Sequence, residues 1–271
     1  GDKDEDGPVQ NTFGEVDIEN NIKHHNLNVI DPEKRPISVL IVEQAPRWEF
    51  RYLMTMLDPL RNKQVKLRVV LYEGDKSIVR SDTFNPRSPY LKEFPDAEAL
   101  REFDVVILGD VSPESLDRDD GQESLLKFVA DYGGRVGMLA GKRYFPSQYA
   151  GTELEQMLPV VLGKDRVVTG QENYGDKEIR IVRTERGRDD PLLRLAEDDK
   201  ENNKIWGDND PKLANNPDRL PPVFWVADVE QTKPQALELL VVDDDKKGQR
   251  FEQRPVLALH GYGAGEVMYV G

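Results

Sequence analysis

A buried strand that runs directly into a glycine turn constrains this chain more than any other feature. Residues 135–140 (RVGMLA) have the apolar character of a strand covered on both faces, and Gly141 follows at once. In α/β enzymes, a strand that enters such a glycine-marked turn often carries the nucleophile. Here the turn continues with Lys142, Arg143 and Tyr144, and the chain contains no cysteine. The segment therefore predicts an enzyme-like α/β scaffold that lacks the nucleophile.

The apolar runs upstream of this strand predict a parallel sheet. Residues 37–42 and 104–110 are nearly continuous and β-branched, which is typical of strands buried on both faces, whereas 65–72 alternates as a strand near an edge does. Segments of helical spacing lie between the strands, at 48–60, 97–103 and 122–132. This alternation predicts βαβ units, and right-handed crossovers would place helices on both faces of the sheet.

The C-terminal third has a different pattern and predicts extra β-strands. After a helical stretch at 152–158, the strand candidates are 178–182, 223–226, 236–242, 255–260 and 266–270. Residues 186–222 are rich in Asp, Asn, Lys and Pro and predict a long surface excursion. The glycines at 261, 263 and 265 join two strands, so they predict a hairpin; a dinucleotide loop would instead open a helix.

Three parts are expected along the chain. Residues 1–12 are acidic and polar and predict a disordered tail. Residues 13–35 contain two short strand-like runs around an Asn-rich turn, followed by a linker that is stiffened by two prolines. Residues 36–271 form the α/β domain, in which 163–222 is an irregular insertion.

Composition excludes several classes of function. The formal net charge of −14 would repel nucleic acid and an anionic membrane surface. The absence of cysteine excludes disulfides, thiolate zinc sites and a cysteine nucleophile. The acidic run at 2–7 matches only half of a calcium loop, and the adjacent His24 and His25 would point to opposite faces of a strand. We therefore expect no metal and no cofactor.

Charged and aromatic residues gather at the expected carboxyl ends of the parallel strands, where ligands bind in open α/β sheets. The candidate ligand-binding residues are Glu43, Arg47, Trp48, Glu49, Asp110, Lys142, Arg143 and His260. An alternative is a purely structural Arg–carboxylate network that holds the loops together, with Trp48 as a lid on the core. His260, at the end of a buried strand, fits either a catalytic or a structural role.

The same segments carry a resemblance to a known family. Residues 39–53 (VLIVEQAPRWEFRYL) and 135–144 (RVGMLAGKRY), with 104–111, 220–226 and 255–271, resemble the class I glutamine amidotransferase-like domains of large bacterial membrane-anchored proteins. The resemblance covers about 36–271 and implies a flavodoxin-like α/β sandwich. It also implies a parent protein with membrane helices and von Willebrand A-like or immunoglobulin-like modules. Residues 15–21 resemble the closing strands of such an immunoglobulin-like module, which would make 13–31 a remnant of the preceding domain.

Active members of this superfamily need a cysteine in a G-x-C-x-G elbow and a His-x-Glu pair that activates it. The elbow falls near Gly141 and Lys142, and His260 is followed by Gly261 and Tyr262 without the acid. The resemblance therefore implies the scaffold without its chemistry.

Three functions follow as hypotheses. The leading one is a non-catalytic domain for binding or assembly in a membrane-anchored bacterial envelope protein, on the extracytoplasmic side. Its partners would be other modules of the parent chain or envelope proteins, and it would meet the membrane only through parent segments outside this sequence. The second is a hydrolase with Glu43 or Asp110 as base and Lys142 or Arg143 as electrostatic stabiliser. The third is a sensor in which Arg47 and Arg143 clamp a small anionic ligand.

Overall fold

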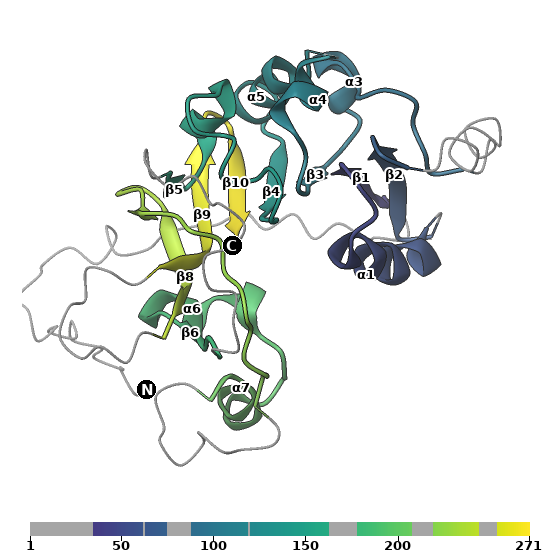
Figure 1. Ribbon diagram of the computed structural model, residues 1–271. Coiled ribbons are helices and arrows are strands. Elements are labelled where there is room, and N and C mark those ends of the chain that lie inside the picture. The colour runs from purple at the N-terminus through teal and green to yellow at the C-terminus, as the bar shows by residue number, and fades with distance from the viewer. Residues whose placement is uncertain are drawn as a thin grey trace, which may run out of the picture.

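The computed structural model describes residues 35–61, 63–74, 88–118, 120–162, 178–207, 219–243 and 254–271. Within them the chain forms a mixed α/β fold around a mostly parallel eight-stranded sheet in the order β2-β1-β3-β4-β10-β9-β8-β6 (Figure 1). The expected tail, the strands within 13–31, His24 and His25 lie outside the described residues. No helix in the described ranges has the length and apolar character that a membrane span requires.

One half of the sheet is parallel and the other is antiparallel. Pairing is parallel from β2 through β1, β3 and β4 to β10, and antiparallel from β10 through β9 and β8 to β6. The strands are β1 (Ile37–Glu43), β2 (Val65–Leu71), β3 (Val105–Leu108), β4 (Arg135–Leu139), β6 (Ile181–Arg183), β8 (Leu237–Val242), β9 (Pro255–Tyr262) and β10 (Gly265–Val270). A separate antiparallel pair joins β5 (Val160–Val161) to β7 (Gln231–Thr232).

Helices cover both faces of the parallel half, as the βαβ pattern predicts. The helical elements are α1 (Trp48–Leu57), η2 (Asp58–Leu60), α3 (Ala97–Leu100), α4 (Pro113–Asp117), α5 (Gly121–Ala130), η3 (Glu153–Met157), α6 (Glu185–Asp189), η4 (Pro191–Leu193) and α7 (Asp199–Trp206). Successive residues of a strand point to opposite faces. Val39 and Ile41 of β1 therefore pack in one cluster with Phe50 of α1, and Leu40 packs in another with Phe128 of α5.

The part of the chain after β4 departs from expectation in three places. The stretch 223–226 is not a strand, because only Val223 pairs, with Ile179, in an isolated bridge. The helix expected at 152–158 is the 3-10 helix η3. The surface excursion contains α6, η4 and α7, and buries Leu193 and Trp206 against the sheet. By contrast, the glycine hairpin is confirmed, because β9 and β10 pair through it and Gly263 has a φ of 58°.

Candidate functional site

The expected site lies where strand order reverses direction. The chain runs from β1 outward to β2, then returns to place β3 on the other side of β1. The loops that follow β1 and β3 therefore lead in opposite directions from the carboxyl ends of these strands. In open parallel sheets the ligand crevice forms between two such loops. Glu43 ends β1 and Asp110 follows β3, so both carboxyl groups lie at this switch point.

Glu43 is a buried carboxyl group, and both of its oxygens accept hydrogen bonds from the chain. Its Oε1 accepts hydrogen bonds from the backbone N–H groups of Gln44 (3.2 Å) and Asp110 (2.9 Å), and its Oε2 accepts one from Nε of Arg47 (2.9 Å). The side chain occupies the place that a Cβ at Gly109 would need, because Oε2 would lie 2.1 Å from that Cβ. Burial raises the pKa of Glu43, and the nearby Arg47 only partly offsets this effect.

Arg47 connects β1 to β4 across the intervening strand β3. Besides the bond to Glu43, its guanidinium donates to the carbonyl oxygens of Ala140 (2.7 Å) and Leu139 (3.2 Å). Glu49, whose side chain is 57% exposed, lies 3.8 Å from the same guanidinium. Three of its N–H donors therefore bind groups of the chain itself, and the expected role of Arg47 as half of an anion clamp stays a prediction.

Asp110 fixes the loop that follows β4. Its Oδ1 accepts from the backbone N–H groups of Tyr144 and Phe145, both at 2.8 Å, and its Oδ2 accepts from that of Arg143 at 2.9 Å. The same carboxyl group fills the space beside Gly141, where a Cβ would lie 2.2 Å from Cγ of Asp110. The turn at 141 therefore has no room for a side chain where an α/β enzyme would carry its nucleophile.

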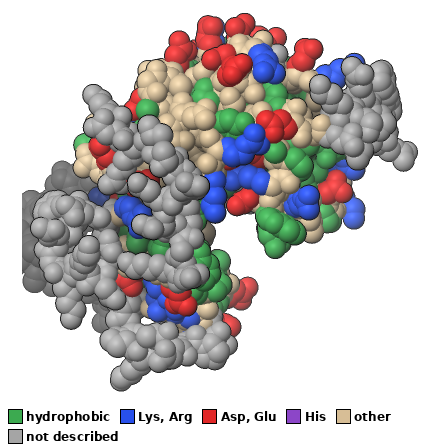
Figure 2. Space-filling model, viewed as in Figure 1, with side chains coloured by type: hydrophobic (Ala, Val, Ile, Leu, Met, Phe, Trp, Pro, Cys, Tyr) green, Lys and Arg blue, Asp and Glu red, His purple; other side chains and the backbone are tan. Residues whose placement is uncertain are grey.

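The loop held by Asp110 presents two exposed cations. Arg143 forms an ion pair with Glu73 (2.9 Å) and donates to the hydroxyl of Tyr144 (2.8 Å), and the side chains of Arg143 and Glu73 are 53% and 43% exposed. Lys142 is exposed, with its Nζ 5.8 Å from the ring centre of Trp225. Figure 2 shows basic side chains gathered in the hollow of this face, near the carboxyl ends of the central strands.

Two candidate residues do not join this cluster. Trp48 is 69% exposed on α1, so its expected role as a lid on the core is wrong. His260 pairs with Val267, which pairs with Val136 near the start of β4. His260 therefore lies at the amino ends of the parallel strands, at the opposite end of the sheet from Glu43 and Asp110.

Sequence reasoning also missed two members of the network. Gln44 donates to Glu73 (2.9 Å) and accepts from the backbone N–H of Ser112 (3.1 Å), so it links the loops that follow β1, β2 and β3. Hydrogen bonds from Arg143 and Gln44 lower the pKa of Glu73. Both residues directly follow strands, so the rule that predicted Glu43 and Asp110 could have included them.

The arrangement favours binding over proton transfer. A general base needs a free lone pair within reach of a substrate. The oxygens of Glu43 and Asp110 instead accept hydrogen bonds from the chain, and both residues are buried. Within the described ranges no three His, Asp or Glu side chains are grouped as metal ligands. What this end of the sheet offers to solvent is positive charge, at Lys142 and Arg143.

Comparisons with known proteins return structural matches only. No family model matches the chain, and no curated protein matches it. Three matching solved structures are Gan42B, a GH42 β-galactosidase from G. stearothermophilus (16% identity, TM-score 0.38), and the β-galactosidases of Bacillus circulans sp. alkalophilus (14%, 0.35) and Rahnella sp. R3 (14%, 0.37). The matches cover 88%, 86% and 87% of this chain but only 27%, 28% and 28% of those chains.

These matches correct the family resemblance. The neighbouring structures are GH42 β-galactosidases and not glutamine amidotransferase-like domains. The same finding overturns the leading interpretation of the chain as a non-catalytic domain of that group in a membrane-anchored envelope protein. Identity and overlap at this level assign no activity to the chain, so its function has to be argued from its own residues.

Proposed function

We propose that this domain binds a small anionic ligand at the carboxyl ends of its parallel strands, through Lys142 and Arg143. One observation carries the proposal. Both cations are exposed on a loop whose backbone is held by three hydrogen bonds to the buried Asp110. A rigid loop presents its charges to a ligand at little entropic cost.

The topology supports the same position. We propose the finer assignment of a flavodoxin-like arrangement for the parallel half, because its order β2-β1-β3-β4 matches that fold class. In such sheets the ligand occupies the switch point between the first and third strands. Here that point is bordered by Gln44, Glu73 and the loop 141–145.

The ion pair between Arg143 and Glu73 supports a carboxylate or phosphate group as the ligand. The pair is exposed, and exposed pairs contribute only about 0–1 kcal/mol, so a ligand anion can replace Glu73 at low cost. The planar guanidinium of Arg143 binds carboxylates and phosphates with two parallel hydrogen bonds, and Lys142, the preceding residue, carries a second positive charge on the same loop. A net charge of −14 opposes highly charged polyanions, which favours a small ligand.

A titration with inorganic phosphate, citrate and a nucleoside monophosphate tests the proposal, with amide chemical shifts and tryptophan fluorescence as the signals. We expect Arg143→Gln and Lys142→Gln each to weaken binding, and Glu73→Gln to strengthen it because the internal competitor is lost. Each change should be about tenfold or less, the equivalent of ~1.4 kcal/mol. Arg101→Gln is the matched control, because Arg101 also forms an exposed pair, with Glu98 at 3.1 Å, but on α3. Equal binding by the Arg143 and Arg101 variants would contradict the proposal.

A hydrolase is the second candidate, favoured by the raised pKa of Glu43 at the switch point. This function would require Glu43 to exchange Arg47 for a substrate. A panel of chromogenic glycosides, esters and amides tests it. Turnover by the wild type that Glu43→Gln abolishes, without a change in the fold, would establish this candidate over the first.

An extracytoplasmic location is also a proposal. Its support is the resemblance of residues 15–21 to an immunoglobulin-like module, a segment that lies outside the described residues. A fusion of the full-length gene product to alkaline phosphatase, which is active only outside the cytoplasm, tests it; an inactive fusion at normal expression would oppose it.

A further inference from the structure

The carboxylate of Glu73 occupies the position on Arg143 where a ligand anion would bind. Its Oε2 accepts a hydrogen bond from Nη1 of Arg143 (2.9 Å), and its Oε1 accepts a longer one from Nη2 (3.4 Å). A guanidinium makes the same two-pronged contact with a free carboxylate. The side chain of Glu73 is 43% exposed, so a molecule from solvent can reach the same place. The contacts of Glu73 therefore show which residues surround an anion at this site.

Gln44 supplies a neutral donor to this carboxylate. Its Nε2 donates to Oε1 of Glu73 at 2.9 Å. The side-chain oxygen of Gln44 accepts from the backbone N–H of Ser112 at 3.1 Å, and the residue is only 6% exposed. Because a backbone N–H can only donate, the oxygen of the amide has to face Ser112. The NH₂ group of Gln44 is thereby directed at whatever anion occupies the place of the Glu73 carboxylate.

Tyr144 orients the guanidinium of Arg143 and adds another donor. Its hydroxyl accepts from Nη2 of Arg143 at 2.8 Å, and it donates to Glu73 in a hydrogen bond that helps to lower the pKa of Glu73. The guanidinium carbon lies 4.8 Å from the centre of the Tyr144 ring. The backbone N–H of Tyr144 binds the buried Asp110 at 2.8 Å, so the backbone that carries this ring is held in place.

The donors of these three residues match the two oxygens of a carboxylate. Arg143 reaches both oxygens of Glu73, and Gln44 adds a second donor to Oε1. An ionised carboxylate can accept about four hydrogen bonds on its two oxygens, so it can satisfy all of these donors at once. A phosphate brings a third oxygen that has no counterpart in Glu73. The group that fits best between Gln44, Arg143 and Tyr144 is therefore a second carboxylate.

We propose that the ligand is a small carboxylic acid whose carboxylate displaces Glu73 and is bound by Gln44, Arg143 and Tyr144. This inference rests on the proposed function, because it uses the same loop and the same arginine. It adds Gln44 and Tyr144 to the binding residues and names the ligand group. Glu73 is then an internal competitor, because a group tethered next to its site has an effective concentration on the order of millimolar.

Removal of the internal carboxylate tests the inference. Glu73→Ala removes one methylene and the carboxylate, and acetate has the size of the group that is lost. We expect acetate to bind this variant at least about tenfold more tightly than the wild type, because the tethered competitor is gone. The side-chain amide resonances of Gln44, followed by NMR, measure the titration. Acetamide, which is neutral, and inorganic phosphate should each bind the variant more weakly than acetate.

Substitution of the two new binding residues in the Glu73→Ala background gives the second measurement, followed by the amide resonances of the loop 141–145. Tyr144→Phe and Gln44→Met each remove one donor and should each weaken acetate binding by about threefold or more. Both changes should also lower the preference for acetate over acetamide, which a merely structural role would not do. Because Gln44 is buried and Tyr144→Phe is a conservative change, the Tyr144 variant decides the test if the Gln44 variant does not fold.

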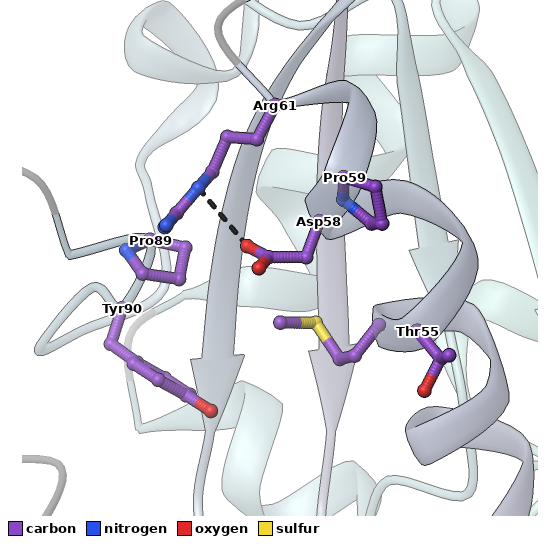
Figure 3. Close-up of a pocket in the computed structure, with 7 residues that line it drawn as sticks. Thr55, Asp58, Pro59, Arg61, Pro89 and Tyr90 are labelled. Atoms are coloured by element: carbon purple, nitrogen blue, oxygen red, sulfur yellow. Dashed lines mark ion pairs between the residues drawn. The ribbon is translucent and has the colours of Figure 1, made fainter.

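Arg61→Gln, in the same background, is the matched control. Arg61 also pairs with a carboxylate, that of Asp58 at 3.0 Å, and both residues line a pocket of about 490 Å³ beside α1 and η2 (Figure 3). Arg61 precedes β2 and Glu73 follows it, so the two ion pairs lie at opposite ends of that strand. We expect Arg61→Gln to leave acetate binding unchanged.

The outcomes separate this inference from the function on which it rests. If Arg143→Gln weakens acetate binding but Tyr144→Phe and Gln44→Met do not, the loop binds anions and the inference is overturned. Tighter binding of phosphate than of acetate to the Glu73→Ala variant would overturn it as well. If no anion binds this variant, the proposed function fails together with the inference.

Discussion

The two halves of the sheet are held together in different ways. In the antiparallel half, β9 and β10 are joined by a tight turn at Gly263, so the chain itself keeps the strands together. In the parallel half, neighbouring strands end in loops that lead away from one another. Glu43 and Asp110 are 67 residues apart along the chain, and Asp110 and Arg143 are 33 apart. Buried side chains connect these loops, which explains why polar groups concentrate at the carboxyl ends of the parallel strands.

The largest expected loss of stability comes from adding a side chain in the parallel half where the structure has no room for one. Gly141→Ala would place a Cβ 2.2 Å from Cγ of Asp110 and push that side chain away from the amides it binds. Overpacking together with unsatisfied amides should lower the free energy of unfolding by about 4 kcal/mol. Gly261→Ala, in β9, meets no atom within 4 Å and should change it by less than about 0.5 kcal/mol. Urea denaturation of both variants measures the contrast, and equal losses would show that the halves do not differ.

Loss of the Asp110 carboxyl group should have the next largest effect. Asp110→Ala leaves three backbone N–H groups without their acceptor, and we expect a loss of about 3 kcal/mol. Asp110→Asn keeps an acceptor oxygen for Tyr144 and Phe145 and should lose less. In the antiparallel half, the hydroxyl of Thr184 donates to the carbonyl oxygen of Glu238 and accepts from the backbone N–H of Gly187. Thr184→Ala should lower the free energy of unfolding by about 1 kcal/mol. A Thr184 variant as unstable as the Asp110→Ala variant would contradict the comparison.

The parallel half was the more predictable from sequence. Its strands are continuous β-branched runs, and the rule for carboxyl ends places Glu43, Arg47, Asp110 and Arg143 in one region without reference to side-chain contacts. The rule could not show that the carboxyl oxygens of Glu43 and Asp110 accept hydrogen bonds from the chain itself. Those partners depend on the geometry of the loops, which apolar periodicity does not encode. Whether Lys142 and Arg143 bind a ligand stays a prediction.

The misses have physical reasons as well. His260 lies at the opposite end of the sheet from the site, because β9 is antiparallel to β10 and β10 is parallel to β4. The predicted hairpin indicates that the two strands run in opposite directions, but not which of them runs with the parallel strands. The helices α6 and α7 are mostly polar, and few apolar side chains, such as Trp206, anchor them. For α1, the helical spacing within 48–60 predicted the helix, but the exposure of Trp48, Tyr52 and Met56 on it could only be found from the structure.

The pH dependence of stability should distinguish the buried carboxyl group of Glu43 from the exposed carboxyl group of Glu73. Burial raises the folded-state pKa of Glu43, so protonation favours the folded state. Its contribution is fully present below the ordinary pKa of 4.5 and is lost as the pH rises through the raised value. The wild type should therefore lose stability relative to Glu43→Gln as the pH rises from about 4 to 7.

Glu73 should behave in the opposite way. Its pKa is lowered by Arg143 and Gln44, so its contribution is present above 4.5 and is lost as the pH falls through the lowered value. Denaturation curves of the wild type, Glu43→Gln and Glu73→Gln at several pH values measure both slopes. Slopes of the same sign for the two carboxyl groups would refute this assignment.

The smallest effect on stability should come from the exposed pair of Arg143 and Glu73, although it should matter most for binding. Their coupling energy in a double-mutant cycle should be about 0.2–1 kcal/mol and should fall in 1 M salt, because exposed pairs are screened. The hydrogen bonds to the buried Asp110 then maintain the loop, while an anion can replace Glu73 as the partner of Arg143. If Arg143→Gln instead destabilised the fold as much as Asp110→Ala, the pair of Arg143 and Glu73 would be needed for stability. An anion could not then displace Glu73 without destabilising the fold.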